Sequence, residues 1–156
     1  MKKIIFIFLL MFSSVSAEKI ERLGFYNLQE LLGDDNLTYK IIRSCVSLNS
    51  AITEITKEDH PQLSKSFFET ANYLYPFGIL TLSKIKKMSY KDVEKEYMAK
   101  VSSQTADYMD FMKANGVTNQ SFIKGTFIGD DLNFCNEIRS AIEITISETN
   151  KLKSEN

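Results

Sequence analysis

The chain has little of the chemistry on which many enzymes and metal proteins depend, because its 156 residues include no tryptophan, one histidine and two cysteines. A zinc site takes three or four closely spaced ligands. No Cys-x-x-Cys is present for thiol redox chemistry or covalent haem attachment. The one histidine, His60, precedes Pro61 with no nucleophile placed beside it. We therefore predict no catalytic residue, no metal site and no cofactor, and we interpret His60 as an exposed residue at a helix start.

Long apolar runs are also absent, except at the amino-terminus. Lys2 and Lys3 precede the apolar run 4–12, and small residues follow, with Val15 and Ala17 at the −3 and −1 positions of a cleavage site. This order is typical of a secretory signal peptide. The alternative is an uncleaved anchor, but the run is far shorter than the roughly 20 residues that span a bilayer.

The predicted signal peptide, residues 1–17, sets the compartment and the charge of the remaining chain. We expect cleavage between Ala17 and Glu18, which leaves 18–156 as one secreted or periplasmic domain without a membrane span. Lys2 and Lys3 leave with it, so the 19 basic residues fall to 17 against 20 acidic ones, a net charge of −3. This balance gives no electrostatic case for nucleic acid or anionic membrane as a partner.

The two cysteines, Cys45 and Cys135, lie 90 residues apart. In an exported chain two cysteines most simply form one disulfide, so we predict a bridge between them. Two separate buried thiols are the alternative, because both residues lie on apolar helical stripes.

Apolar residues recur every three or four positions in four segments, which predicts four amphipathic helices. The stripes are Leu37, Ile41, Cys45, Leu48, Ile52 and Ile55; Leu63, Phe67, Ala71, Leu74, Gly78, Leu82 and Ile85; Val93, Tyr97, Val101, Thr105, Tyr108 and Met112; and Leu132, Cys135, Ile138, Ile142 and Ile146.

Capping residues suggest where the first helices begin and end. A short helix is expected over 25–32 and would stop at Gly33. Asp35 or Asn36 can cap the next helix. Pro61 suits the first turn of the one after it, where a missing N–H costs no hydrogen bond.

The later boundaries follow the same logic. Ser89 is the expected cap of the third long helix, and Asn115-Gly116 its left-handed stop. We expect 117–130 to be a connection that lies against the bundle, because it carries two aromatics.

Two local conflicts have to be resolved. Pro76 falls inside the second stripe and removes an amide that would bond the Asn72 carbonyl. The stripe keeps its phase across the proline, so we favour one kinked helix over about 62–87 rather than two helices. Residues 142–146 alternate like a strand, but no partner strand is visible, so a helix is favoured there too.

Three pairs of adjacent acidic residues could indicate catalysis by carboxylates, but each pair stands before a predicted helix. There a carboxylate satisfies free amides and opposes the positive end of the helix dipole, so capping is the preferred interpretation. The pairs are Asp34-Asp35, Glu58-Asp59 and Asp130-Asp131.

Tyrosines gather around the proline of the second long helix and on the helix that follows. Pro76 frees a carbonyl and Gly78 removes side-chain bulk, so a pocket for a small apolar or aromatic molecule is a hypothesis for this region. The alternative is that these rings fill the core. The candidate lining residues are Tyr73, Tyr75, Tyr97 and Tyr108.

These observations predict an all-α protein: a mostly up-down four-helix bundle with a short extra N-terminal helix, held by one disulfide. We expect a non-enzymatic binding or protein-interaction role with a protein partner. The alternative is a carrier of a small hydrophobic or aromatic ligand near Pro76.

Overall fold

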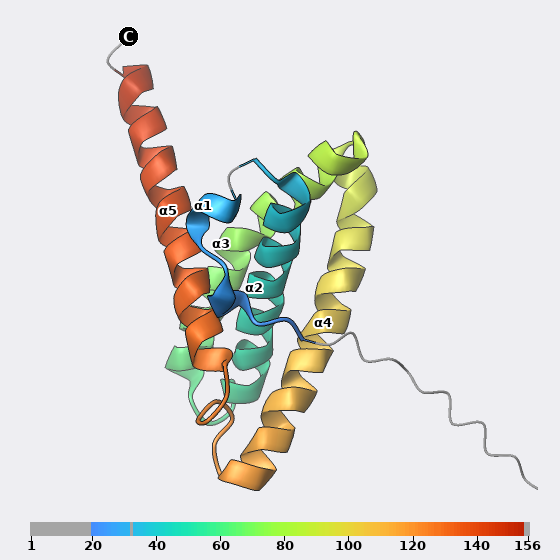
Figure 1. Ribbon diagram of the computed structural model, residues 1–156, viewed down its shortest axis with the longest axis vertical. Helices are drawn as coiled ribbons and strands as arrows, with labels where there is room; N and C mark the ends of the chain where they lie inside the picture. The colour runs from blue at the N-terminus through green and yellow to red at the C-terminus, as the bar shows by residue number, and fades with distance from the viewer. Residues whose placement is uncertain (1–19, 32, 155–156) are drawn as a thin grey trace, which may run out of the picture.

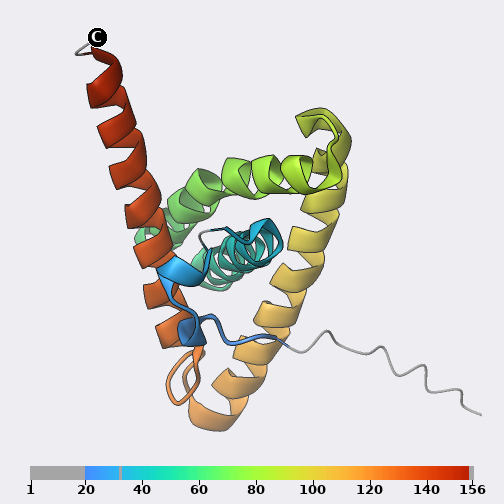
Figure 2. The same cartoon turned by 45° about the horizontal axis from the view of Figure 1, so that its top comes forward.

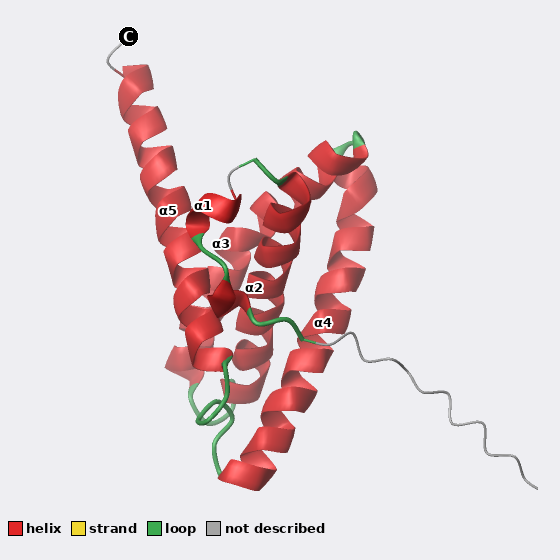
Figure 3. Cartoon of the chain, in the orientation of Figure 1, coloured by secondary structure: helices red, strands yellow, loops and turns green. Residues whose placement is uncertain are grey.

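The computed structural model describes residues 20–31 and 33–154, so the predicted signal peptide and its cleavage site at Ala17–Glu18 lie outside the described residues. A 3₁₀ turn, Leu23–Phe25, and a short helix, α1 (Leu28–Leu31), come first. Four long helices follow: α2 (Asp35–Thr56), α3 (Pro61–Lys86), α4 (Tyr90–Asn119) and α5 (Ile128–Ser154). No strand occurs among the described residues (Figure 3), which confirms the predicted all-α class.

Helix α2 is the central element of the bundle. It contacts α1, α3, α4 and α5, whereas α4 and α5 diverge on either side of it (Figures 1 and 2). This position follows from its sequence, because its face is apolar over most of its length and eleven of its residues are buried. The four long helices, the short N-terminal helix and the disulfide agree with the predicted architecture.

Helix α3 runs without interruption from Pro61 through Pro76, as the phase of its stripe indicated. Pro61 occupies its first turn, and Lys87 ends it in a left-handed conformation with φ 54°. The helix bends near its middle in Figure 2, which is the expected response to an internal proline.

The predicted stop of α4 at Asn115-Gly116 is wrong. The helix continues to Asn119, and Gln120 adopts the left-handed conformation instead. The lack of a side chain at Gly116 lets the ring of Phe122 in the following loop approach α4, because a Cβ there would lie 2.9 Å from that ring. The predicted cap at the other end of α4 is confirmed, because Ser89 accepts a hydrogen bond from the amide of Asp92.

The predicted caps of α5 are also wrong. The helix begins at Ile128, and the hydroxyl of Thr126 accepts a hydrogen bond from the Ile128 amide (3.2 Å). Asp130 and Asp131 therefore lie inside the first turn. The alternating stretch 142–146 is helical, as expected.

At the start of α2 the cap is Asp34, one residue before Asp35 and two before Asn36, the two caps expected. Its carboxylate accepts hydrogen bonds from the amides of Asn36 and Leu37 (2.9 and 3.0 Å). Glu58 and Asp59 lie exposed in the turn before α3, and no capping hydrogen bond from either is recorded among the described residues. A capping hydrogen bond is thus present for the first acidic pair, whereas Asp130 and Asp131 meet only the second part of the interpretation, because they lie in the first turn of α5, at the positive end of its dipole.

The core has two parts along α2. One surrounds Cys45 and Cys135, whose disulfide joins α2 to α5 with a Cα–Cα distance of 5.4 Å, so the predicted bridge is confirmed. The other surrounds Tyr108 on α4 and includes Leu48 and Ile52. Within the part of the chain described here, no helix has the length and apolar character needed to cross a membrane.

Candidate functional site

A large apolar depression lies between α1, α2, α3 and α5. Its volume is about 540 Å³, within the range of roughly 300–1,000 Å³ that is usual for ligand pockets. We call it the α5 groove, since five of its lining residues come from that helix. The lining is Leu28, Gln29, Leu31, Thr38, Ile42, Phe77, Ile138, Ala141, Ile142, Thr145 and Ile146.

The disulfide holds two walls of the groove together. Ile42 lies three residues before Cys45 on α2, and Ile138 lies three residues after Cys135 on α5. At 3.6 residues per turn each isoleucine sits about one helical turn from its cysteine. Both isoleucines are at least 95% buried, so the base of the groove is part of the core.

A third wall comes from residues 20–31, which we call the N-terminal strap. It passes beside the lower part of α5 (Figure 1), where the buried carboxylate of Asp131 accepts hydrogen bonds from the amides of Leu23 and Gly24 (2.7 and 2.9 Å). Farther along, the hydroxyl of Thr38 donates to the carbonyl of Leu31 (2.7 Å). These contacts fix α1, and with it Leu28 and Leu31, beside α5.

Asp131 is an unusual anchor because it is fully buried. Its Oδ1 receives both strap amides, whereas Oδ2 has no partner within the described residues. Burial disfavours the charged form more than these hydrogen bonds favour it, and it raises the pKa of Asp131 to about 6.

Above the groove α5 extends past the other helices (Figures 1 and 2). The stripe that begins with buried Ile138 continues through half-buried Ile142 to Ile146, which is 41% exposed. An i, i+4, i+8 row of isoleucines therefore leads from the core to the surface along one side of the groove.

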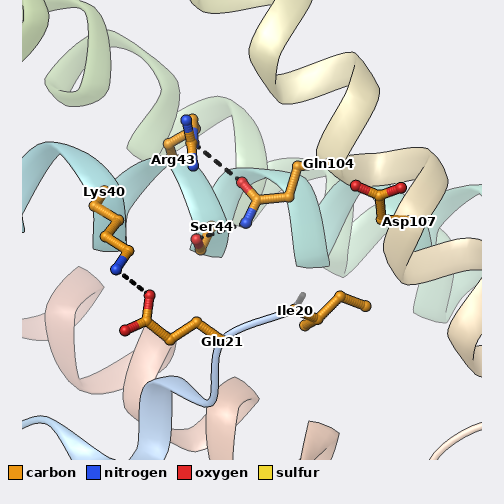
Figure 4. A pocket seen from close by; sticks show the side chains of 7 residues that line it. All are labelled: Ile20, Glu21, Lys40, Arg43, Ser44, Gln104 and Asp107. Atoms are coloured by element: carbon orange, nitrogen blue, oxygen red, sulfur yellow. Dashed lines mark hydrogen bonds and ion pairs between the residues drawn. The ribbon is translucent and has the colours of Figure 1, made fainter. Parts of the chain in front are cut away.

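A second depression is polar and lies on another side of α2, between the strap and α4. Its volume is about 210 Å³ (Figure 4). We call it the polar pocket. Side chains from three segments line it: Ile20, Glu21, Lys40, Arg43, Ser44, Gln104 and Asp107.

One amide organises the polar pocket. The side-chain oxygen of Gln104 accepts a hydrogen bond from Arg43 Nε (3.1 Å), and its nitrogen donates to the hydroxyl of Ser44 (2.8 Å). Lys40 forms an ion pair with Glu21 of the strap. The pocket therefore presents hydrogen-bonding groups and charges of both signs.

The four tyrosines proposed as a pocket lining do not form one group. Tyr97 is fully buried and its ring fills the space beside Gly78. The ring of Tyr75 packs edge-on against it at 5.2 Å, whereas Tyr73 packs against Phe77 at 5.7 Å. Tyr108 belongs to the other part of the core. Burial raises the pKa of both Tyr97 and Tyr108, as expected for phenols inside a core.

His60 and the potential metal ligands are the remaining side chains considered in the sequence. His60 is exposed at the start of α3 and makes no side-chain capping hydrogen bond. Among the described residues, no three histidine, cysteine or acidic side chains are placed to hold a metal ion.

Sequence reasoning missed both depressions. Phe77, which lines the α5 groove, stands next to Pro76, whereas the tyrosine pocket predicted from the sequence would lie between α3 and α4. The acidic pair at 130–131 was visible, yet its contact with Leu23 spans 108 residues and leaves no local pattern. Comparisons of the chain with known protein families, with curated proteins and with solved structures found no match.

Proposed function

We propose that this chain is an exported, non-enzymatic binding protein, whose α5 groove takes up the apolar face of a helix from a partner protein. The observation that carries this proposal is the groove itself: eight of its eleven lining side chains are apolar, and it opens along an exposed helix. Docking an amphipathic helix into an apolar groove is a common mode of protein recognition.

The shape of the groove favours a helix over a compact molecule. The row Ile138, Ile142 and Ile146 continues beyond the enclosed part, so an occupant longer than the groove would keep burying apolar surface. Each buried methylene stabilises such a complex by about 0.8 kcal/mol before the costs of association.

The lining also supports a role without catalysis. None of the eleven side chains is an acid, base or thiol, so the lining holds no general base that could activate the hydroxyl of Thr38 or Thr145. The buried carboxylate of Asp131 accepts hydrogen bonds from the strap and is not among the lining residues of the groove.

Export rests on the first 17 residues and on the disulfide. A charged start, a short apolar run and small residues before Glu18 match a secretory signal. The Cys45–Cys135 bridge suits an oxidising compartment such as the periplasm or the cell exterior.

A carrier of a small hydrophobic ligand is the second candidate. The groove volume of about 540 Å³ and the aromatic wall at Phe77 support it. It differs from the sequence-based hypothesis in its location, because Tyr97 fills the space at Gly78.

A binding experiment separates these candidates. Fluorescence anisotropy would follow a labelled 18-residue helical peptide of leucine and lysine, whereas an anilinonaphthalene dye would report small apolar ligands. We expect the peptide to bind and Ala141→Glu, which adds a charge to the groove, to weaken binding at least about tenfold. Ser140→Glu is the matched control, because Ser140 is exposed and does not line the groove.

The outcomes are distinct. Binding of the dye alone, sensitive to Ala141→Glu, would favour the carrier. Binding of neither probe, or equal effects of the two variants, would refute the groove as a binding site.

A further inference from the structure

The polar pocket contains two opposite charges that do not pair with each other. Lys40 and Glu21 neutralise one another, but no ion pair between Arg43 and Asp107 is recorded in the described part of the chain. In Figure 4 Gln104 lies between them. A half-buried cation and a half-buried anion thus line the same small pocket without pairing with each other.

The guanidinium of Arg43 keeps hydrogen-bond donors for an external partner. Its Nε donates to Gln104, and its central carbon lies 5.6 Å from the Tyr39 ring centre. The two terminal amino groups make no hydrogen bond to a described residue. A planar guanidinium held in this way binds a carboxylate through parallel hydrogen bonds.

Asp107 supplies the opposite charge from α4. It follows Gln104 by three residues, so both side chains lie on the same face of the helix. No hydrogen bond or ion pair of its carboxylate is recorded within the described residues. Such a carboxylate is an acceptor for an ammonium group.

We propose that the polar pocket binds a small zwitterion of the α-amino acid class, with its carboxylate on Arg43 and its ammonium on Asp107. The volume of about 210 Å³ suits such a ligand, since it is below the roughly 300–1,000 Å³ of pockets for larger molecules. Ile20 of the strap provides an apolar contact at the edge. This site shares no residue with the α5 groove, so its test is independent of the proposed function.

The test is an NMR titration of the ¹⁵N-labelled chain from Glu18 onward with L-alanine. Two analogues each lack one charge: N-acetyl-L-alanine has no ammonium, and L-alaninamide has no carboxylate. We expect L-alanine to shift the resonances of Ser44 and Gln104, and both analogues to bind at least about tenfold more weakly.

Two variants assign the charges. Arg43→Gln and Asp107→Asn are each expected to reduce L-alanine binding at least about tenfold. Asp110→Asn, an exposed position on the same helix, is the matched control and is expected to bind as the unmodified chain does. Because Arg43 also packs on Tyr39, Arg43→Lys provides a second, milder variant if Arg43→Gln fails to fold.

Three results would overturn the proposal. They are no shift at these residues with L-alanine at tens of millimolar, equal binding of L-alaninamide or N-acetyl-L-alanine, and unchanged binding by Asp107→Asn. Each result would show that Arg43 and Asp107 do not bind the two charges of one zwitterion.

Discussion

The phenol ring of Tyr97 on α4 occupies the space where a side chain on Gly78 of α3 would begin. A Cβ built on Gly78 would lie 2.7 Å from Cε2 of that ring, much closer than van der Waals contact allows. The glycine after Pro76 is therefore the site of close approach between two helices, and the ring that fills it is held by Tyr39 and Tyr75.

This relationship predicts that Gly78→Ala destabilises the protein. Displacing a packed ring costs about 1–3 kcal/mol, which the gain in helix propensity of about 1 kcal/mol only partly offsets. Gly129→Ala is the matched control, because Gly129 is helical and a Cβ there meets no atom within 4 Å. Urea unfolding measures both changes. A Gly78→Ala variant at least as stable as Gly129→Ala would contradict the packing.

The disulfide should contribute a large share of stability. Replacing both Cys45 and Cys135 with alanine should lower the free energy of unfolding by about 2–5 kcal/mol, because the bridge closes a loop between residues 90 apart. Denaturant unfolding measures this loss. Alkylation of two thiols in the native exported protein, seen by intact mass, would show instead that the bridge is absent.

The buried carboxylate of Asp131 predicts a pH dependence. Its pKa is raised from 3.8 to about 6 in the folded chain, so the folded state favours the protonated form. The stability from this group is complete below about pH 4 and is lost as pH rises through about 6, by up to about 3 kcal/mol. The charge of Arg22 lowers the pKa of Asp131, whereas the charge of Asp130 raises it further.

Asp131→Asn isolates that contribution, because an amide oxygen can still accept the hydrogen bonds from Leu23 and Gly24. The difference in unfolding free energy between the unmodified chain and the variant should change between pH 4 and 7, with the unmodified chain losing stability as pH rises. A difference that is constant over this range would mean that Asp131 titrates normally.

The first 17 residues predict where the exported chain begins. N-terminal sequencing of protein recovered from the periplasm or medium should start at Glu18. Recovery of the chain from the membrane fraction with Met1 retained would contradict export by a cleaved signal.

Local and tertiary features differed in how well the sequence predicted them. The stripe of α2 and the phase of α3 across Pro76 follow from helical periodicity, so these elements were predicted well. The end of α4 was misplaced because Gly116 is needed for the approach of Phe122, a contact made after the chain turns back. A glycine pattern alone does not distinguish a helix stop from a close approach.

The candidate sites were beyond prediction for a related reason. The α5 groove combines residues from four helices, and Phe77 lines it only because α3 turns that face toward α5. The strap depends on a carboxylate at position 131 meeting amides at positions 23 and 24. Neither arrangement has a periodic signature in the chain.

The most direct test of the α5 groove as the binding site is a methyl NMR spectrum of the isoleucine-labelled chain, titrated with the leucine–lysine helical peptide. We expect shifts at Ile42, Ile138, Ile142 and Ile146, which line the groove, and none at Ile144, which is exposed on another side of α5. Ile128, in the other part of the core, should also be unchanged. Shifts at Ile144 as large as those in the groove, or no shift at the four groove residues, would contradict binding of the peptide in the α5 groove.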